Sequence, residues 1–118
     1  MKSSFAILSA TLLVASNAAV AQQSSSERQQ FLHTWSEAKH VFESAKARND
    51  ETPACNAEMN QLYNSMLRIG QDVQHAIETA KASNMPDPRN NSLVNDFYRT
   101  GINVLPQLAN LTRTYCGV

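Results

Sequence analysis

Two histidines and a glutamate are the first candidates for chemistry in this chain. His33, Glu37 and His40 follow one another at steps of four and three residues, so on a helix they share one face. Imidazole and carboxylate groups gathered at one site can ligate a transition metal. This face lies opposite an apolar stripe, and the two histidines stand two turns apart, so a shared ion would need a ligand from another element. We therefore predict solvated side chains here and no metal site.

The sequence lacks the usual signatures of catalytic and cofactor sites. Met59 and Met66 are of the type that ligates haem iron, but methionine on an apolar stripe more often fills a core. Glu58 and Asp72 fall on one helix about 21 Å apart along its axis, too far for paired acid–base work. Neither a Gly-x-Ser-x-Gly turn nor a glycine-rich phosphate loop is present. We predict a non-enzymatic protein with no catalytic residues and no cofactor.

The first 21 residues have the pattern of a secretory signal peptide. Lys2 supplies a positive start, residues 5–14 are largely apolar, and Ala19-Val20-Ala21 is a small-x-small cleavage site. We expect cleavage after Ala21 and a mature chain of residues 22–118, which suits a single small domain. The predicted location is the periplasm, or outside the cell if the protein is secreted. Asn90 and Asn110 begin Asn-x-Ser/Thr tripeptides, which are glycosylation acceptors only in a eukaryotic host.

Charge and hydropathy argue against two classes of partner. The chain has ten basic and ten acidic residues, and removal of Lys2 with the signal peptide leaves nine against ten, without a basic patch. Nucleic-acid binding is therefore not expected. Residues 22–118 contain no run of about 18 apolar residues, so we expect no membrane span in the mature chain.

Three amphipathic segments make up the mature chain. In each, apolar residues recur at alternating steps of four and three, the period of a helix with one buried face. Thr52 and Pro53 are typical of a helix start, and the two prolines within residues 83–88 are typical of a loop. No strand-like alternation appears. We predict an all-α fold, a small antiparallel three-helix bundle, with helices at about 26–48, 53–82 and 92–115.

The two cysteines provide a check on this topology. Cys55 falls at the start of the second segment and Cys116 at the end of the third. In an antiparallel pair of helices these two ends lie side by side, as a disulfide requires. Export to an oxidising compartment favours the same pairing. We therefore predict a Cys55–Cys116 disulfide, and we expect Trp35, in the middle of the first apolar stripe, to lie in the core.

The third segment carries two apolar lines instead of one. Beside a first line lies a second one containing Tyr98, Ile102, Leu105 and Ala109, so the apolar arc covers about half the circumference. Either this helix is central and contacts both neighbours, or Tyr98, Ile102 and Leu105 stay exposed as a binding patch. The first line consists of Val94, Phe97, Gly101, Val104, Leu108, Leu111 and Tyr115.

Two functions are consistent with these features. The first is an exported, non-enzymatic helical protein that acts by protein–protein interaction in the cell envelope. It would serve as a periplasmic accessory, a chaperone-like, inhibitor or immunity protein, or an accessory component of secretion or conjugation. Its partner would be an envelope protein or a second copy of the chain, bound at Tyr98, Ile102 and Leu105. The alternative is a secreted carrier of a small apolar ligand within the helical bundle.

Overall fold

The structure, a computed structural model, describes residues 26–118. These residues form three helices: residues 26–48, α2 (Pro53–Ala82) and α3 (Ser92–Cys116), with no strand in the described part of the chain. The bounds of α2 and α3 agree with the predicted ranges to within one residue, and the first helix ends at residue 48, as predicted. The predicted signal peptide, residues 1–21, lies outside the described residues.

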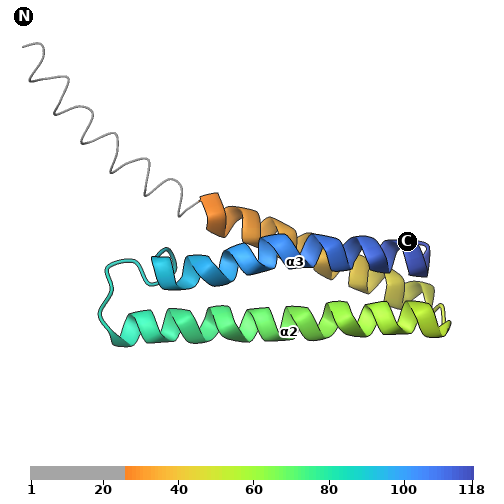
Figure 1. The fold of residues 1–118 in the computed structure, drawn as a ribbon, viewed down its shortest axis with the longest axis horizontal. Coiled ribbons are helices and arrows are strands. Elements are labelled where there is room, and N and C mark those ends of the chain that lie inside the picture. Colours follow the sequence, from red (N-terminus) through yellow and green to blue (C-terminus); the bar gives the residue numbers. More distant parts are fainter. Residues whose placement is uncertain (1–25) are drawn as a thin grey trace, which may run out of the picture.

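Consecutive helices run in opposite directions and pack together (Figure 1). α2 and α3 lie antiparallel side by side, and the first helix packs alongside them (Figure 1). The connections are short, residues 49–52 and 83–91. Short connections favour packing against the preceding helix in the opposite direction. The predicted all-α, antiparallel three-helix bundle is confirmed.

Local signals set the helix ends. Thr52 caps α2, because its Oγ1 accepts a hydrogen bond of 3.4 Å from the Cys55 amide. Asn91 caps α3 in the same way, accepting a bond of 3.1 Å from the Val94 amide. Gly117 ends α3 with a φ of 67°, a left-handed conformation that glycine adopts without strain. Each cap satisfies a backbone group that the helix itself leaves free.

The core is built from the inward lines of the three helices. Tyr98, Leu62 and Leu105 are the largest fully buried side chains. Burial of apolar surface, at about 25 cal/mol per Å², is the main stabilising contribution in such a bundle. The other buried members of this core are Phe31, Ala38, Val41, Met66, Ile69, Val73, Ala76, Ile77, Val94 and Ala109.

A disulfide joins the start of α2 to the end of α3. The Sγ atoms of Cys55 and Cys116 are 2.01 Å apart, the Cα atoms are 4.8 Å apart, and both side chains are buried. Ala45 of the first helix packs against them. At the same end, Arg48 donates a hydrogen bond of 2.6 Å to the Gly117 carbonyl. The predicted disulfide is confirmed, and this end of the bundle links all three helices.

Candidate functional site

The structure buries most of the patch that was predicted to bind a partner. Tyr98 is 2% exposed and Leu105 is 0% exposed, while Ile102 is half-buried against the core. The Tyr98 hydroxyl donates a hydrogen bond of 2.8 Å to the Arg89 carbonyl, and its ring packs on Phe31 with centroids 5.1 Å apart. The predicted exposure of Tyr98 and Leu105 is therefore wrong. Their line faces the neighbouring helices, as the alternative interpretation expected.

Cys116 explains which apolar line of α3 faces inward. Because the disulfide holds Cys116 against α2, residues at steps of three and four before it share its face. Phe97, Leu111 and Tyr115 of the first line are consequently turned towards the side of the helix, whereas Val94 and Gly101 of the same line are buried. The residues buried on the Cys116 face are Val94, Tyr98, Gly101, Leu105, Ala109 and Thr112.

The residues of the first line that are turned aside form a partly exposed apolar surface along one side of α3. Leu111 is 41% exposed and Tyr115 is 50% exposed, whereas Val104 and Leu108 are half-buried. We call these four residues the α3 flank. Val104 lines a depression of about 320 Å³ together with residues of α2, so the flank borders α2 and not the first helix.

The α3 flank carries no charged side chain. Between Thr100 and Val118 the sequence has one charged residue, Arg113. Its guanidinium points away from the flank towards the first helix, 4.0 Å from the carboxylate of Glu37. Depletion of charge, combined with exposed aromatic and aliphatic side chains, distinguishes the core of an interface from an ordinary solvated surface.

Glu58 of α2 has a buried carboxylate oxygen. The Thr112 hydroxyl donates a hydrogen bond of 3.4 Å to the Glu58 carbonyl, which places Glu58 of α2 beside the turn of α3 that holds Leu111. Glu58 Oε2 is buried and has no hydrogen-bond donor among the described residues. A buried acceptor without a donor is destabilising.

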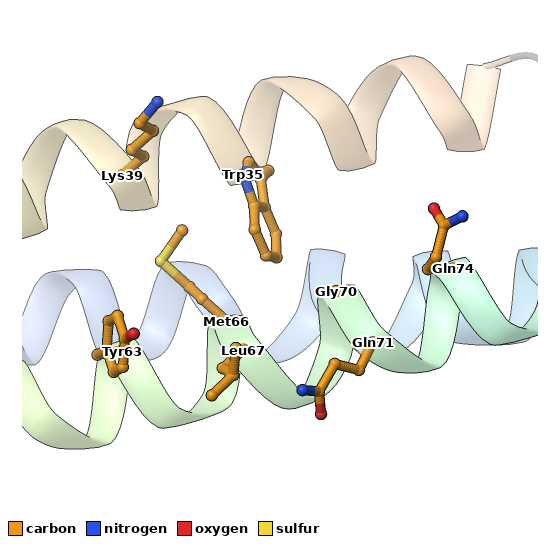
Figure 2. Close-up of a pocket in the computed structure, with 8 residues that line it drawn as sticks. All are labelled: Trp35, Lys39, Tyr63, Met66, Leu67, Gly70, Gln71 and Gln74. Atoms are coloured by element: carbon orange, nitrogen blue, oxygen red, sulfur yellow. The ribbon is translucent and has the colours of Figure 1, made fainter.

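A second candidate site is an apolar groove of about 460 Å³ between the first helix and α2. Figure 2 shows Trp35 reaching from the first helix towards α2 and Met66 reaching back from α2. Tyr63 and Leu67 lie along the α2 side and are 51% and 48% exposed. We call this site the Trp35 groove. Its lining residues are Trp35, Lys39, Tyr63, Met66, Leu67, Gly70, Gln71 and Gln74.

Gly70 allows the two walls of the groove to approach. A Cβ atom at this position would lie 2.9 Å from Cη2 of Trp35, closer than carbon atoms pack. The indole therefore rests on the backbone of α2. Trp35 is half-buried and packs against the core without being enclosed by it, so the prediction of a core residue is confirmed only in part. Its ring also contacts Phe31, with centroids 5.7 Å apart.

His33, Glu37 and His40 do not converge on one site. His33 Nε2 lies 3.4 Å from Glu37 Oε1, and both side chains are exposed. His40 is exposed as well. Within residues 26–118, no group of three or more His, Cys, Asp or Glu side chains is placed to hold a metal ion. The arrangement is a contact between neighbouring turns of one helix.

Tyr98 is the titratable group most affected by burial. Desolvation raises the pKa of its hydroxyl above the ordinary value of 10.0, because the charged phenolate is disfavoured away from water. The nearby guanidiniums of Arg28 and Arg89 act in the opposite direction. Since the hydroxyl donates to a backbone carbonyl inside the bundle, Tyr98 is a structural residue and not an acid or base for catalysis.

The Trp35 groove was not predicted from the sequence, although a signal for it exists. Tyr63 and Leu67 stand four residues apart beside the buried stripe of α2, and Gly70 follows three residues later. That spacing gives α2 a second apolar line and so a wider arc. The position of Trp35 over a glycine on a different helix has no signal within either segment alone.

No family model matches the chain, and no match is found among curated proteins or solved structures. In the described part of the chain, no helix combines the length and apolar character needed to cross a membrane. Function is therefore inferred from the surfaces and from the physical chemistry of the residues on them.

Proposed function

We propose that this chain is an exported, non-enzymatic binding protein of the cell envelope that recognises a partner protein through the α3 flank. One observation carries the proposal: Leu111 and Tyr115 stay exposed on a side of α3 that has no charged side chain. The disulfide fixes the rotation of α3 and therefore the orientation of this flank. A rigid apolar surface of this kind binds with little cost of ordering.

The flank also indicates the chemistry of the partner. The exposed apolar side chains of the flank favour a partner that presents apolar side chains, whereas Arg68 and Asp72 of α2, which line the depression beside Val104, favour polar groups at its edge. Either another protein or a second copy of the chain can satisfy this description.

Site-specific photo-crosslinking in the source cells tests the proposal. A photoreactive residue replaces Leu111 in one variant and Leu67 in the other, because both leucines are exposed to a similar degree but lie on different faces. We expect a discrete crosslinked protein from position 111 and none from position 67. A product of twice the mass of the chain would identify the partner as a second copy. Crosslinking from position 67 alone, or from neither position, would contradict the proposal.

A second function, carriage of a small apolar ligand, is favoured by the Trp35 groove. Its volume of about 460 Å³ falls in the usual range for ligand sites. The core is closed, with Leu62 and Leu105 fully buried, so a ligand would lie beside the bundle and not within it. The groove and the α3 flank are on different faces, and the two functions are compatible. Displacement of a bound apolar dye by lipid extract, and its loss in Leu67→Gln, would test this function.

A further inference from the structure

We propose that the Trp35 groove binds a free, single-chain amphiphile with an anionic head group, such as a fatty acid. The inference rests on the carrier function and specifies its ligand, and it is independent of the α3 flank. Three features of the groove carry it: an apolar wall of aromatic and aliphatic side chains, a floor where the indole of Trp35 rests on a glycine, and a rim with a cation and no acid.

The apolar wall suits a hydrocarbon chain. Trp35 and Met66 meet from opposite helices, and Leu67 and Tyr63 continue the apolar surface along α2 (Figure 2). From Tyr63 to Gln74 the groove follows α2 for about 16 Å at 1.5 Å per residue, with apolar side chains from Tyr63 to Leu67 and glutamines at positions 71 and 74. A narrow site of this length accommodates one extended chain, whereas a second chain would exceed the volume of about 460 Å³.

Gly70 and the indole of Trp35 together form the floor of the groove. The ring of Trp35 already occupies the space where a Cβ atom would lie, and it leaves no side chain of α2 between the two helices at this level. A methylene chain lying beside the indole would contact the ring edge, Met66 and Leu67 together. Burial of each methylene group then strengthens binding about fourfold.

The rim supplies the charge that selects the head group. Lys39 is the single charged residue among the eight that line the groove, and no aspartate or glutamate is among them. Within residues 26–118, Lys39 takes part in no ion pair. Figure 2 shows its amine directed away from α2, on a flexible stem that can turn back towards the groove. A carboxylate at the mouth can therefore pair with Lys39 while the chain lies in the groove.

The other end of the groove carries the opposite charge. The Gln74 amide donates a hydrogen bond of 3.1 Å to the Glu78 carboxylate. An anionic head group would be repelled at this end and attracted at the Lys39 end, so the ligand has one favoured direction. The chain runs from Lys39 towards Gln74, along the residues that line the groove.

Trp35 is the only tryptophan in the sequence and reports directly on the groove. Its fluorescence is titrated in the purified, disulfide-bonded protein with dodecanoate, dodecyl maltoside and dodecyltrimethylammonium, each below its micelle concentration. We expect dodecanoate to bind most tightly and the cationic amphiphile most weakly. Shortening the chain to decanoate removes two methylenes and lowers the affinity by up to about 15-fold.

Two pairs of matched variants locate the site. Lys39→Gln should weaken dodecanoate binding about two- to fivefold, as expected for an exposed ion pair, and Lys46→Gln should not, although both variants lose one positive charge. Leu67→Gln should weaken all three amphiphiles, and Leu111→Gln should weaken none, because Leu111 lies on the α3 flank.

The possible outcomes test the anionic head group and the carrier function separately. Equal affinities for all three amphiphiles, with Leu67→Gln still weakening them, would overturn the anionic head group but leave an apolar carrier. No fluorescence change with any of them would overturn both. A response to phosphatidylglycerol vesicles that exceeds the response to dodecanoate would show a bilayer surface and would overturn the free ligand.

Discussion

Trp35 of the first helix rests on Gly70 of α2, so closely that a Cβ atom at position 70 would lie 2.9 Å from Cη2 of the indole. A second pair repeats the relationship one turn earlier on the first helix. There Phe31 packs over Gly101 of α3, where a Cβ atom would lie 2.5 Å from Cε2 of the ring. Each glycine accepts one aromatic ring, and together they fix the first helix on both of its neighbours.

Alanine substitution at the two glycines should have unequal effects on stability. In a helix interior, alanine is favoured over glycine by about 1 kcal/mol at either position. At Gly101 the new methyl group collides with Phe31, which is buried, and overpacking of this kind costs about 1–3 kcal/mol. At Gly70 it meets the far end of Trp35, which is half-exposed and can turn away. Gly101→Ala should therefore be the less stable variant in urea unfolding.

The comparison of the two alanine variants serves as its own control. Because the helix propensity gain is the same, the difference between their free energies of unfolding reports packing alone. We expect a change in Trp35 fluorescence for Gly70→Ala with its free energy of unfolding close to that of the wild type. Equal stability of Gly70→Ala and Gly101→Ala would contradict the packing of Phe31 described above.

The disulfide should contribute strongly to stability. It links residues 61 positions apart in the sequence. A loop of that length corresponds to about 4 kcal/mol in the chain-entropy account, which is an upper value for most bridges. The double variant Cys55→Ala/Cys116→Ala should show a marked loss in thermal and urea unfolding. A melting temperature equal to that of the oxidised wild type would contradict this contribution.

Alkaline pH should destabilise the fold through Tyr98. Its pKa is raised by burial in the folded state, so the unfolded chain releases this proton first as the pH rises above about 10. The contribution of the protonated Tyr98 hydroxyl to the free energy of unfolding is fully present below that pH. It is lost as the pH rises through the folded-state pKa of Tyr98. Tyr98→Phe removes this dependence and, at neutral pH, costs about 0.5–1.5 kcal/mol for the lost hydrogen bond to Arg89. Urea unfolding of the wild type and of Tyr98→Phe between pH 8 and about 11 measures how the free energy of unfolding of each depends on pH.

An identical alkaline loss in wild type and Tyr98→Phe would assign the effect to other groups. Tyr63 and Tyr115 provide the matched comparison, because both are exposed. Tyr63→Phe and Tyr115→Phe should keep the wild-type dependence on pH. These variants show whether the pH dependence comes from a buried tyrosine or from any tyrosine in the chain.

The helices and the disulfide could be predicted because their signals are local or mutually consistent. Thr52 and Gly117 are typical capping residues and stand where α2 begins and α3 ends. Cys55 and Cys116 fall at the two helix ends that an antiparallel arrangement brings together. Topology and pairing were therefore fixed by two independent observations that agree.

The rotation of α3 was not predicted because its two apolar lines are similar in composition. Phe97 and Leu111 are no less apolar than Tyr98 and Leu105, so periodicity alone does not choose between the lines. The choice depends on tertiary contacts, namely the bond to Cys55 and the ring of Phe31 over Gly101. Counting back from Cys116 in steps of three and four would have selected the buried line.

The most direct test of the proposed function compares partner binding by Leu111→Lys and Leu67→Lys. Both variants place a lysine at an exposed leucine, so both should unfold within about 1 kcal/mol of the wild type. Affinity for the crosslinked partner, or self-association by sedimentation if that partner is a second copy, is then measured for each. We predict at least about a tenfold loss for Leu111→Lys, the scale of an interface hot spot, and wild-type binding for Leu67→Lys. Unchanged binding by Leu111→Lys, or equal losses in both folded variants, would contradict the assignment of the α3 flank.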